Sequence, residues 1–368
     1  MKRLCLAWLA LLLAACSGPP PDQDTPVGVS QALGGDPEPG FARATDPRPF
    51  SFPADHGAHP DFKNEWWYLT GNLAAPSGRR FGYQVTLFRI ALAPESALRA
   101  SRWATRQVWM AHVALTDVAA GTHQARERLA RQALGLAGAG LDPLRVWLED
   151  WRLDGTGNDF PWHLRVDAGD FALELELAGD RPMLQGDQGL SQKSAEPGNA
   201  SYYYSLPRLA TQGEIRAGDQ RYPVQGLSWL DREWSTSSLG PDQVGWDWLS
   251  LQFQDGTDLM YYQLRRRDGS PDPHSRGAAR LADGRRLDLL PAEVKLTPRE
   301  FWTSPQGRRY PIVWDLDTPA QPRQLRVRAL LPDQLMELSV RYWEGAVEIL
   351  DRDGGARLGY GYLEMTGY

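Results

Sequence analysis

Apolar and polar residues alternate with a period of two through most of the chain beyond residue 65. A segment with this period places successive side chains on opposite faces of a β-strand, so it constrains the chain to sheets. Asp-Gly pairs, which favour the positive φ angles of tight hairpins, begin at residues 154, 255, 268, 283 and 353. The pattern predicts an all-β fold of antiparallel hairpins. We expect a helix only at 125–136, and strands at 81–89, 108–118, 145–153, 162–166, 171–177, 246–253, 259–264, 281–289, 312–316, 325–330 and 338–343.

A Trp-rich segment followed by an aromatic segment containing Tyr-Gln occurs twice. Residues 65–69 (Glu-Trp-Trp-Tyr-Leu) precede 81–85, and residues 246–249 (Trp-Asp-Trp-Leu) precede 259–264. Two similar β-barrels would produce this echo, whereas two unrelated aromatic-rich β-domains could share it by chance. We expect two antiparallel barrels in tandem, at 55–237 and 238–368, because Ser, Gly, Pro and Asp gather near 235–244.

The N-terminus resembles a bacterial lipobox. Two cations precede an apolar stretch at 4–13, which is too short to span a bilayer at about 20 residues. Leu13-Ala-Ala-Cys16 follows, so we expect removal of residues 1–15 as a signal peptide, lipidation of Cys16 and a flexible tether at 16–54. The alternative is a plain secretory signal with an incidental Cys16. Ser17, where an Asp would be the inner-membrane retention signal, implies an outer-membrane anchor that faces the periplasm, with the inner membrane as the alternative.

Composition and motifs exclude several function classes. The formal net charge is -6 and no long basic run occurs, which argues against general nucleic-acid binding. The chain has no Gly-x-Ser-x-Gly elbow, no phosphate-binding Gly loop and no His-Glu-x-x-His sequence. We therefore expect no cofactor and no metal.

Acidic residues and histidines gather before the first Trp-rich segment. Asp55, His56, His59, Asp61 and Glu65 lie within eleven residues. They suit either a metal site or, as the simpler interpretation, a hydrogen-bonded segment that leads into a strand.

The Trp-rich segment at 65–69 carries an acid of its own. Alternation places Glu65 and Trp67 on one face of the strand and Trp66 and Tyr68 on the other. Glu65 is then either a buried acid with a raised pKa or a carboxylate paired with an Arg.

Aromatic and charged residues are densest around the expected break between the barrels. The cluster consists of Trp229, Asp231, Arg232, Glu233, Trp234, Trp246, Asp247, Trp248, Tyr261 and Tyr262. Aromatic rings around a few charges suit an elongated apolar ligand or a developing carbocation. The alternative is a salt-bridged turn at 231–233 that docks the two barrels. The aromatic strand at 202–208 is either pocket lining or barrel wall.

Several motifs together resemble AttH-like proteins, which are also labelled lipocalin-like or secreted hydrolases. The resemblance covers nearly all of the mature body and implies two lipocalin-like barrels side by side. It also implies an association with ABC-transporter components of the lipoprotein-release type. The matching segments are residues 55–60, 64–72, 107–112, 203–208, 231–234, 245–248 and 361–368.

The same superfamily includes carotenoid 1,2-hydratases. Their implied chemistry is protonation of an alkene by a carboxylic acid, followed by capture of the cation by water. Their pattern places a His two residues before a Trp. Here Trp234 matches the Trp and Arg232 stands at the His position. A Tyr-x-Asp element of the pattern is also missing, because Gln263 and Leu264 follow the two tyrosines. Asp231, Glu233 and Asp247 are the candidate replacements for the acid.

The sequence therefore predicts an anchored periplasmic protein that binds an apolar or lipid-like ligand between two barrels. The alternative is a cofactor-independent hydratase of the carotenoid 1,2-hydratase type, and a hydrolase is a third interpretation. We expect Arg232 to bind a carboxylate of the second barrel. The predicted ligand-binding residues are Trp229, Arg232, Trp234, Trp246, Trp248, Tyr261, Tyr262, Glu65 and Trp67.

Overall fold

A computed structural model describes residues 27–28, 39–94, 101, 103–156, 160–179, 181–236 and 239–368. Within these ranges nearly all regular structure is β-strand, and the one helix is a single 3-10 turn, η1 (Ala54–His56). The predicted all-β fold is confirmed. No helix in the described ranges is long and apolar enough to cross a membrane. Cys16 lies outside the described residues, so its lipidation stays a prediction.

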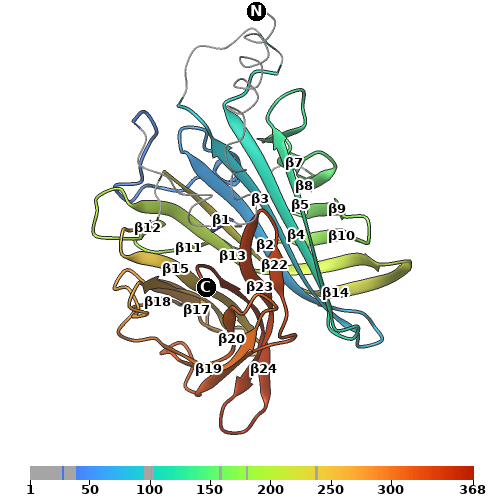
Figure 1. The fold of residues 1–368 in the computed structure, drawn as a ribbon, viewed down its shortest axis with the longest axis vertical. Helices are drawn as coiled ribbons and strands as arrows, with labels where there is room; N and C mark the ends of the chain where they lie inside the picture. The colour runs from blue at the N-terminus through green and yellow to red at the C-terminus, as the bar shows by residue number, and fades with distance from the viewer. Residues whose placement is uncertain are drawn as a thin grey trace, which may run out of the picture.

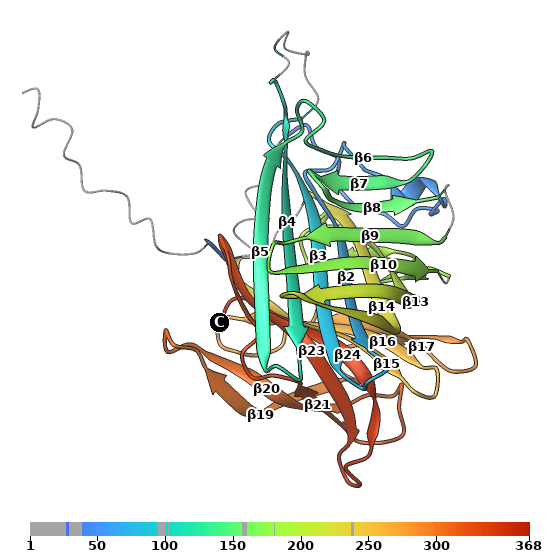
Figure 2. The same ribbon diagram turned by 90° about the vertical axis from the view of Figure 1, so that its right-hand side faces the viewer.

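The N-terminal half forms one antiparallel sheet of 13 strands in the order β5-β4-β3-β2-β14-β13-β10-β9-β8-β7-β6, with β11 and β12 paired to β13. It curls into a nearly closed barrel, because β7, beside one edge, contacts β3, β4 and β5 near the other (Figures 1 and 2). Its strands are β2 (Asn64–Ala74), β3 (Arg80–Ala91), β4 (Gln107–Asp117), β5 (Thr122–Arg131), β6 (Ala137–Gly140), β7 (Arg145–Leu148), β8 (Trp151–Gly155), β9 (Trp162–Asp167), β10 (Phe171–Ala178), β11 (Met183–Leu184), β12 (Leu190–Gln192), β13 (Ala200–Ala217) and β14 (Gln220–Ser235).

The C-terminal half forms a second sheet of 11 strands in the order β18-β17-β16-β15-β24-β23-β21-β20-β19, which curves into a half-barrel. β22 also pairs with β23, and β1 adds a short parallel pairing to β23. Its strands are β1 (Val27–Gly28), β15 (Gln243–Phe253), β16 (Asp258–Arg266), β17 (Arg276–Arg280), β18 (Arg286–Leu289), β19 (Lys295–Thr303), β20 (Arg309–Asp317), β21 (Leu325–Ala329), β22 (Leu335–Glu337), β23 (Val340–Asp351) and β24 (Arg357–Met365).

The two halves share one connectivity. In the first sheet, β2 lies between the next strand, β3, and the long last strand, β14. In the second sheet, β15 lies between the next strand, β16, and the last strand, β24. The aromatic echo in the sequence falls on these equivalent strand pairs, in agreement with tandem lipocalin-like barrels.

Three local predictions are wrong. Residues 122–131 form β5, which pairs along its whole length with β4, so pairing with a neighbour overrides the helix-favouring composition. Residues 281–285 form the turn of the β17–β18 hairpin and are not strand. The predicted strand at 145–153 is two strands, because the β7–β8 hairpin turns at 149–150, where Glu149 has a φ of 56°, and the Asp-Gly pair at 154 therefore lies inside β8.

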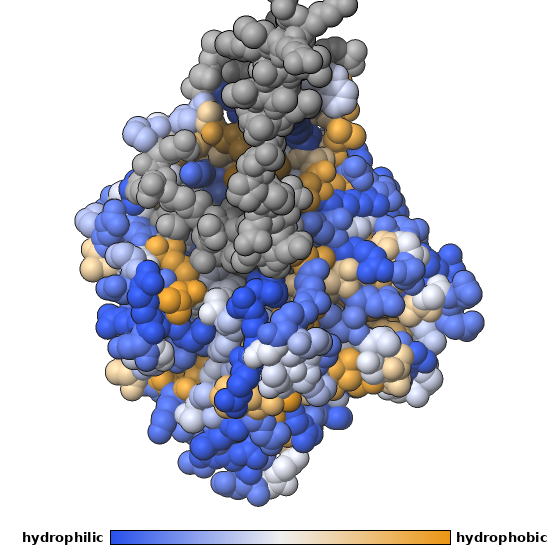
Figure 3. Space-filling model, in the orientation of Figure 1, coloured by the Kyte–Doolittle hydropathy of each residue, from blue (hydrophilic) through white to orange (hydrophobic). Residues whose placement is uncertain are grey.

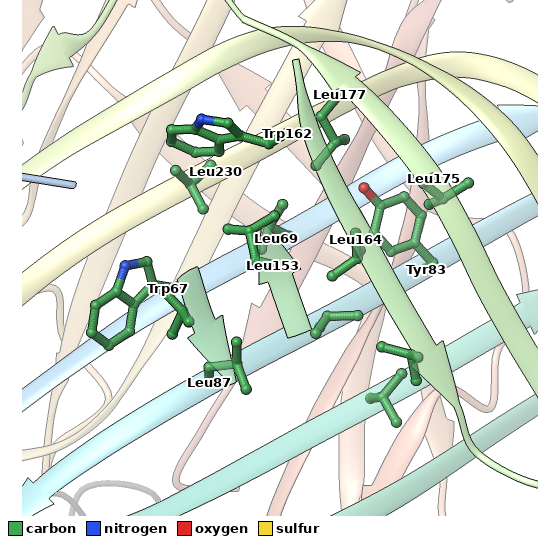
Figure 4. Close-up of a cluster of buried hydrophobic side chains, with 14 of the residues drawn as sticks. Trp67, Leu69, Tyr83, Leu87, Leu153, Trp162, Leu164, Leu175, Leu177 and Leu230 are labelled. Carbon is green, nitrogen blue, oxygen red and sulfur yellow. The ribbon is translucent and has the colours of Figure 1, made fainter. Parts of the chain in front are cut away.

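Large side chains fill the interior of the first barrel. Tryptophans and leucines from β2, β8, β9 and β14 meet there, together with Tyr83 of β3 (Figure 4). The sequence alternation explains this arrangement, since every second side chain points inward, and away from the second sheet the other set points to a largely polar surface (Figure 3). The interior of the first barrel is thus a packed core.

The two sheets pack against each other through a surface that we call the junction. β2 and β3 of the first sheet contact β24 and β23 of the second, and β13 contacts β15 and β16 (Figure 2). The backbones approach closely at Gly82, where an added Cβ would lie 2.5 Å from the Cβ of Ala346. A buried cluster rich in aromatic residues fills the junction, and it includes Tyr68, Tyr203, Trp229, Trp248, Tyr262 and Tyr362.

Candidate active site

Strand β14 divides the predicted site residues between its two faces. Because side chains alternate along a strand, Trp229, Asp231 and Glu233 face the junction, whereas Arg232 and Trp234 face the interior of the first barrel. All five are buried. The single cluster predicted from the sequence is therefore two separate sites.

Arg232 binds a carboxylate of its own barrel. Its Nη2 donates to Glu65 Oε2 at 2.5 Å, and its Cζ lies 3.7 Å from the centroid of the Trp67 ring. Glu65 also accepts a hydrogen bond from Arg89. Burial alone would raise the pKa of Glu65, but Arg232, His59 and Arg89 outweigh burial and hold that pKa well below its usual range. The expectation of a partner from the second barrel is wrong, and Glu65 is a paired anion rather than an acid.

The segment before β2 is held by hydrogen bonds and ring contacts. Asp55 pairs with Arg48 at 2.5 Å and lies 3.1 Å from Nε2 of His59. The His59 ring stacks on Trp234, with the ring centroids 3.7 Å apart. These contacts are those of the hydrogen-bonded segment that we expected as the simpler interpretation.

Asp247 and Tyr261 lie away from Asp231. Both point toward the core of the second sheet, on the faces of β15 and β16 opposite to the junction. Asp247 accepts a hydrogen bond from the Tyr368 hydroxyl at 2.7 Å and pairs with Arg265 at 3.2 Å. The structure therefore does not bring these two predicted site residues to the junction.

Asp231 is the most fully hydrogen-bonded acid of the junction. It accepts from the Tyr203 hydroxyl at 2.5 Å, from Ser205 Oγ at 2.6 Å and from Trp229 Nε1 at 2.7 Å. Burial raises the pKa of Asp231 to about 7, against the opposing effect of these three donors. Three donors aimed at one carboxyl group suit its charged form.

Two further carboxyl groups enter the junction from the second sheet. Glu344 on β23 and Glu364 on β24 are directly opposite each other in the antiparallel register, and both face the junction. Like charges at directly opposite positions repel, so such a pair is destabilising when both members ionise. A proton shared between the two removes the repulsion.

The surroundings of these two glutamates favour the protonated form. Glu344 is fully buried, and the hydroxyls of Tyr68 and Tyr342 lie within hydrogen-bonding reach of its carboxyl group. Burial, followed by the charge of Glu364, raises the pKa of Glu344 well above its usual range. Burial raises the pKa of Glu364 to about 7, and the charges of Asp231 and Glu233 act in the same direction. Acids tuned in this way are typical of functional sites.

Glu364 lies at a partly exposed edge of the junction. Glu364, Trp246 and Trp66 are half-buried, whereas Glu344 and Trp248 are buried. Trp246 Nε1 donates to Glu364 Oε1 at 2.8 Å and orients it. Aromatic rings continue inward, with Tyr68 packed edge-on against Trp248 at 5.0 Å between centroids. Glu364 is therefore the member of the pair that lies nearer the partly exposed edge.

Glu233 and Tyr262 have partners of their own. Glu233 pairs with Lys193 at 3.0 Å and accepts a hydrogen bond from Ser201. The Tyr262 hydroxyl lies 2.8 Å from Ser191 Oγ. An ion-paired Glu233 is less suited to donate a proton than the pair on β23 and β24.

Comparison with known proteins shows the family of this chain. The family model described as AttH-like matches residues 43–368. The chain belongs to the AttH-like family. A solved structure assigned as AttH, from Nitrosomonas europaea, is 37% identical, with a TM-score of 0.80 over 89% of this chain and 100% of that one. Kievitone hydratase from Nectria haematococca is 13% identical, with a TM-score of 0.62 over 89% of this chain and 98% of that one, and shares the fold.

A curated relative matches part of this AttH-like protein. The dehydratase asqC from Emericella nidulans is 22% identical over 192 residues, which is 50% of this chain and 53% of the relative. The chain thus spans about half the length of that relative.

The structure also shows that Arg232 lies away from the junction acids. The hydratase pattern expects a His at this position, but residue 232 points into the first barrel and away from the junction acids. Its replacement by Arg leaves Asp231, Glu344 and Glu364 in place. We did not predict the two glutamates from the sequence, although both stand at the junction-facing positions of segments rich in aromatic residues.

Proposed function

We propose that this AttH-like protein is a hydro-lyase, which adds water to an apolar alkene at the junction or removes it in reverse, with Glu364 as the proton donor. The observation that carries the proposal is the Glu344–Glu364 pair, in which two opposed carboxyl groups lie among aromatic side chains and one reaches a half-buried edge. This is the hydratase alternative from the sequence, with a different acid.

The arrangement supports a complete reaction. The O–H bond of Glu364 breaks, and its proton forms a C–H bond at one alkene carbon, which leaves a carbocation at the other carbon. The rings of Trp246 and Trp248 and the charge of Asp231 stabilise that cation. Water forms the C–O bond, and its excess proton passes to Asp231. One molecule of water is added, and Asp231 and the glutamate pair must then exchange protons with solvent.

The comparisons support this class of reaction. The fold is shared with a protein named as a hydratase, and a partial relative is named as a dehydratase. Both names describe addition or removal of water, which is one reaction in two directions. The ligand-binding role that we favoured from the sequence needs no acid with a raised pKa, so the junction carboxyl groups favour catalysis.

The test is incubation of the full chain with isoprenoid alkenes of increasing length, up to lycopene, and with the matching tertiary alcohols, in ¹⁸O-labelled water. Products are identified by mass spectrometry. Glu364→Gln removes the proton donor. Glu348→Gln is the matched control, because Glu348 lies on the neighbouring strand β23, which carries Glu344, but pairs with Arg328 at 2.6 Å.

We expect an ¹⁸O-labelled alcohol to form with the wild type and with Glu348→Gln, but not with Glu364→Gln. Equal activity of Glu364→Gln and the wild type would contradict the assignment of the acid. If the wild type binds the alkene but does not convert it, the ligand-binding role is supported instead.

A further inference from the structure

Three side chains link the outer face of the first sheet to the junction. Glu127 on β5 keeps 17% of its side chain exposed, and its carboxyl group lies 3.0 Å from Nε2 of His112 on β4. The other imidazole nitrogen, Nδ1, lies 2.7 Å from the hydroxyl of Tyr342 on β23. His112 and Tyr342 are buried. Because Glu127 and His112 are opposite each other on the outer face of the first sheet, the line runs from solvent along that face to the second sheet.

The line ends beside the glutamate pair. Tyr342 and Glu344 are two residues apart on β23, so they share the junction face, and the Tyr342 hydroxyl lies within hydrogen-bonding reach of the Glu344 carboxyl group. Glu344 in turn is opposite Glu364. Imidazole and hydroxyl groups both donate and accept, which allows a proton to pass along the line as each hydrogen bond reverses.

The surroundings of His112 do not call for polar groups. The cluster around it is apolar, with Phe88, Met110, Met336 and Val340 among its members. An apolar pair would fill the same space without the cost of removing an imidazole and a hydroxyl from water. The polar line therefore needs a reason other than packing.

We propose that Glu127, His112 and Tyr342 form a proton relay, which recharges the Glu344–Glu364 pair from solvent. The proposal rests on the proposed function, in which a proton leaves the pair and another arrives at Asp231 in each turnover. An apolar substrate at the half-buried edge excludes water from Glu364, so a second route is needed while the edge is covered. His112 and Tyr342 act through Glu344 and are positioning residues.

The test follows hydrogen–deuterium exchange of the Glu344 proton by infrared spectroscopy after the full chain is mixed with D₂O. It uses the Glu364→Gln background, so that Glu344 is the one carboxyl group left of the pair, and Glu344→Gln assigns its C=O band. Tyr342→Phe and His112→Gln each interrupt the line. His123→Gln is the control, because its imidazole lies 2.9 Å from Thr116, which bonds Gln334 and not a carboxyl group.

We expect exchange to slow by roughly tenfold or more in Tyr342→Phe and in His112→Gln, and to be unchanged in His123→Gln. Equal rates in all of these proteins would overturn the relay, as would the absence of a C=O band assigned to Glu344. Circular dichroism and melting temperature identify a variant that does not fold. If one of Tyr342→Phe and His112→Gln fails to fold, the exchange rate of the other tests the relay. No substrate is used, so a missing hydratase activity defeats the proposed function and leaves this test intact.

Discussion

Replacing Glu364 with Gln is expected to stabilise the protein at alkaline pH but not at acidic pH. Gln has nearly the same size, and its carbonyl oxygen can accept the hydrogen bond that Trp246 donates at 2.8 Å. Its amide does not ionise, so it removes one buried charge and its repulsion with Asp231 and Glu233. If the protein becomes more stable when Glu364 is replaced, then Glu364 lowers the stability of the folded protein, as residues kept for function often do.

The magnitude follows from the pKa of Glu364, which is raised from 4.5 to about 7, first by burial and then by Asp231 and Glu233. A raised carboxyl pKa means that the unfolded chain releases this proton at a lower pH than the folded protein does. The wild type therefore loses stability between about pH 4.5 and pH 7, and the whole loss is present above pH 7. The loss is about 3 kcal/mol without solvent screening, and about 1–3 kcal/mol for a half-buried group.

The assay is urea denaturation of the wild type and Glu364→Gln at pH 4.5 and at pH 8.5, followed by tryptophan fluorescence. We expect Glu364→Gln to have a higher free energy of unfolding at pH 8.5 and an equal one at pH 4.5. The control, Glu348→Gln, loses its pair with Arg328 and should show no gain at pH 8.5. A difference of the same size at both pH values, or a loss at pH 8.5, would refute the reasoning.

Three other substitutions test separate parts of the structure. Arg232→Ala leaves Glu65 without one of its buried partners and should cost about 3 kcal/mol, seen as a lower melting temperature; an unchanged melting temperature would show that the pair adds nothing. Gly82→Val places a side chain against Ala346 and should lower the melting temperature and speed proteolysis between the halves, whereas wild-type behaviour would mean that the sheets do not pack as described. Cys16→Ser should move the protein from the membrane fraction to the soluble fraction of an expressing bacterium, and membrane association that survives this change would rule out the lipid anchor.

The fold could be predicted from the sequence because strand alternation is a local property. Glu65 and Trp67 face one side of β2, and Trp66 and Tyr68 face the other, as the alternation predicts. The same rule divides β14 into two sets of side chains. It does not say which set meets the second sheet, because that depends on how two distant sheets pack.

The acid pair could not be predicted because it depends on register. Glu344 and Glu364 are on different strands, and only the pairing of β23 with β24 places them opposite each other. The available signal was that both acids lie in strands rich in aromatic residues. Arg232 attracted attention because the resemblance assigns chemistry to its position, although the side chain lies inside the first barrel.

The central claim is that the junction holds a proton between two opposed glutamates at neutral pH. The most direct measurement is a pH titration of the full chain by NMR with ¹³C-labelled glutamate carboxyl groups, assigned with Glu344→Gln and Glu364→Gln. We expect a two-step titration with one carboxyl group of the pair still protonated at pH 7, and a single step at lower pH for Glu344 once Glu364 is replaced. Titration of both glutamates near their ordinary value of 4.5 would contradict the account.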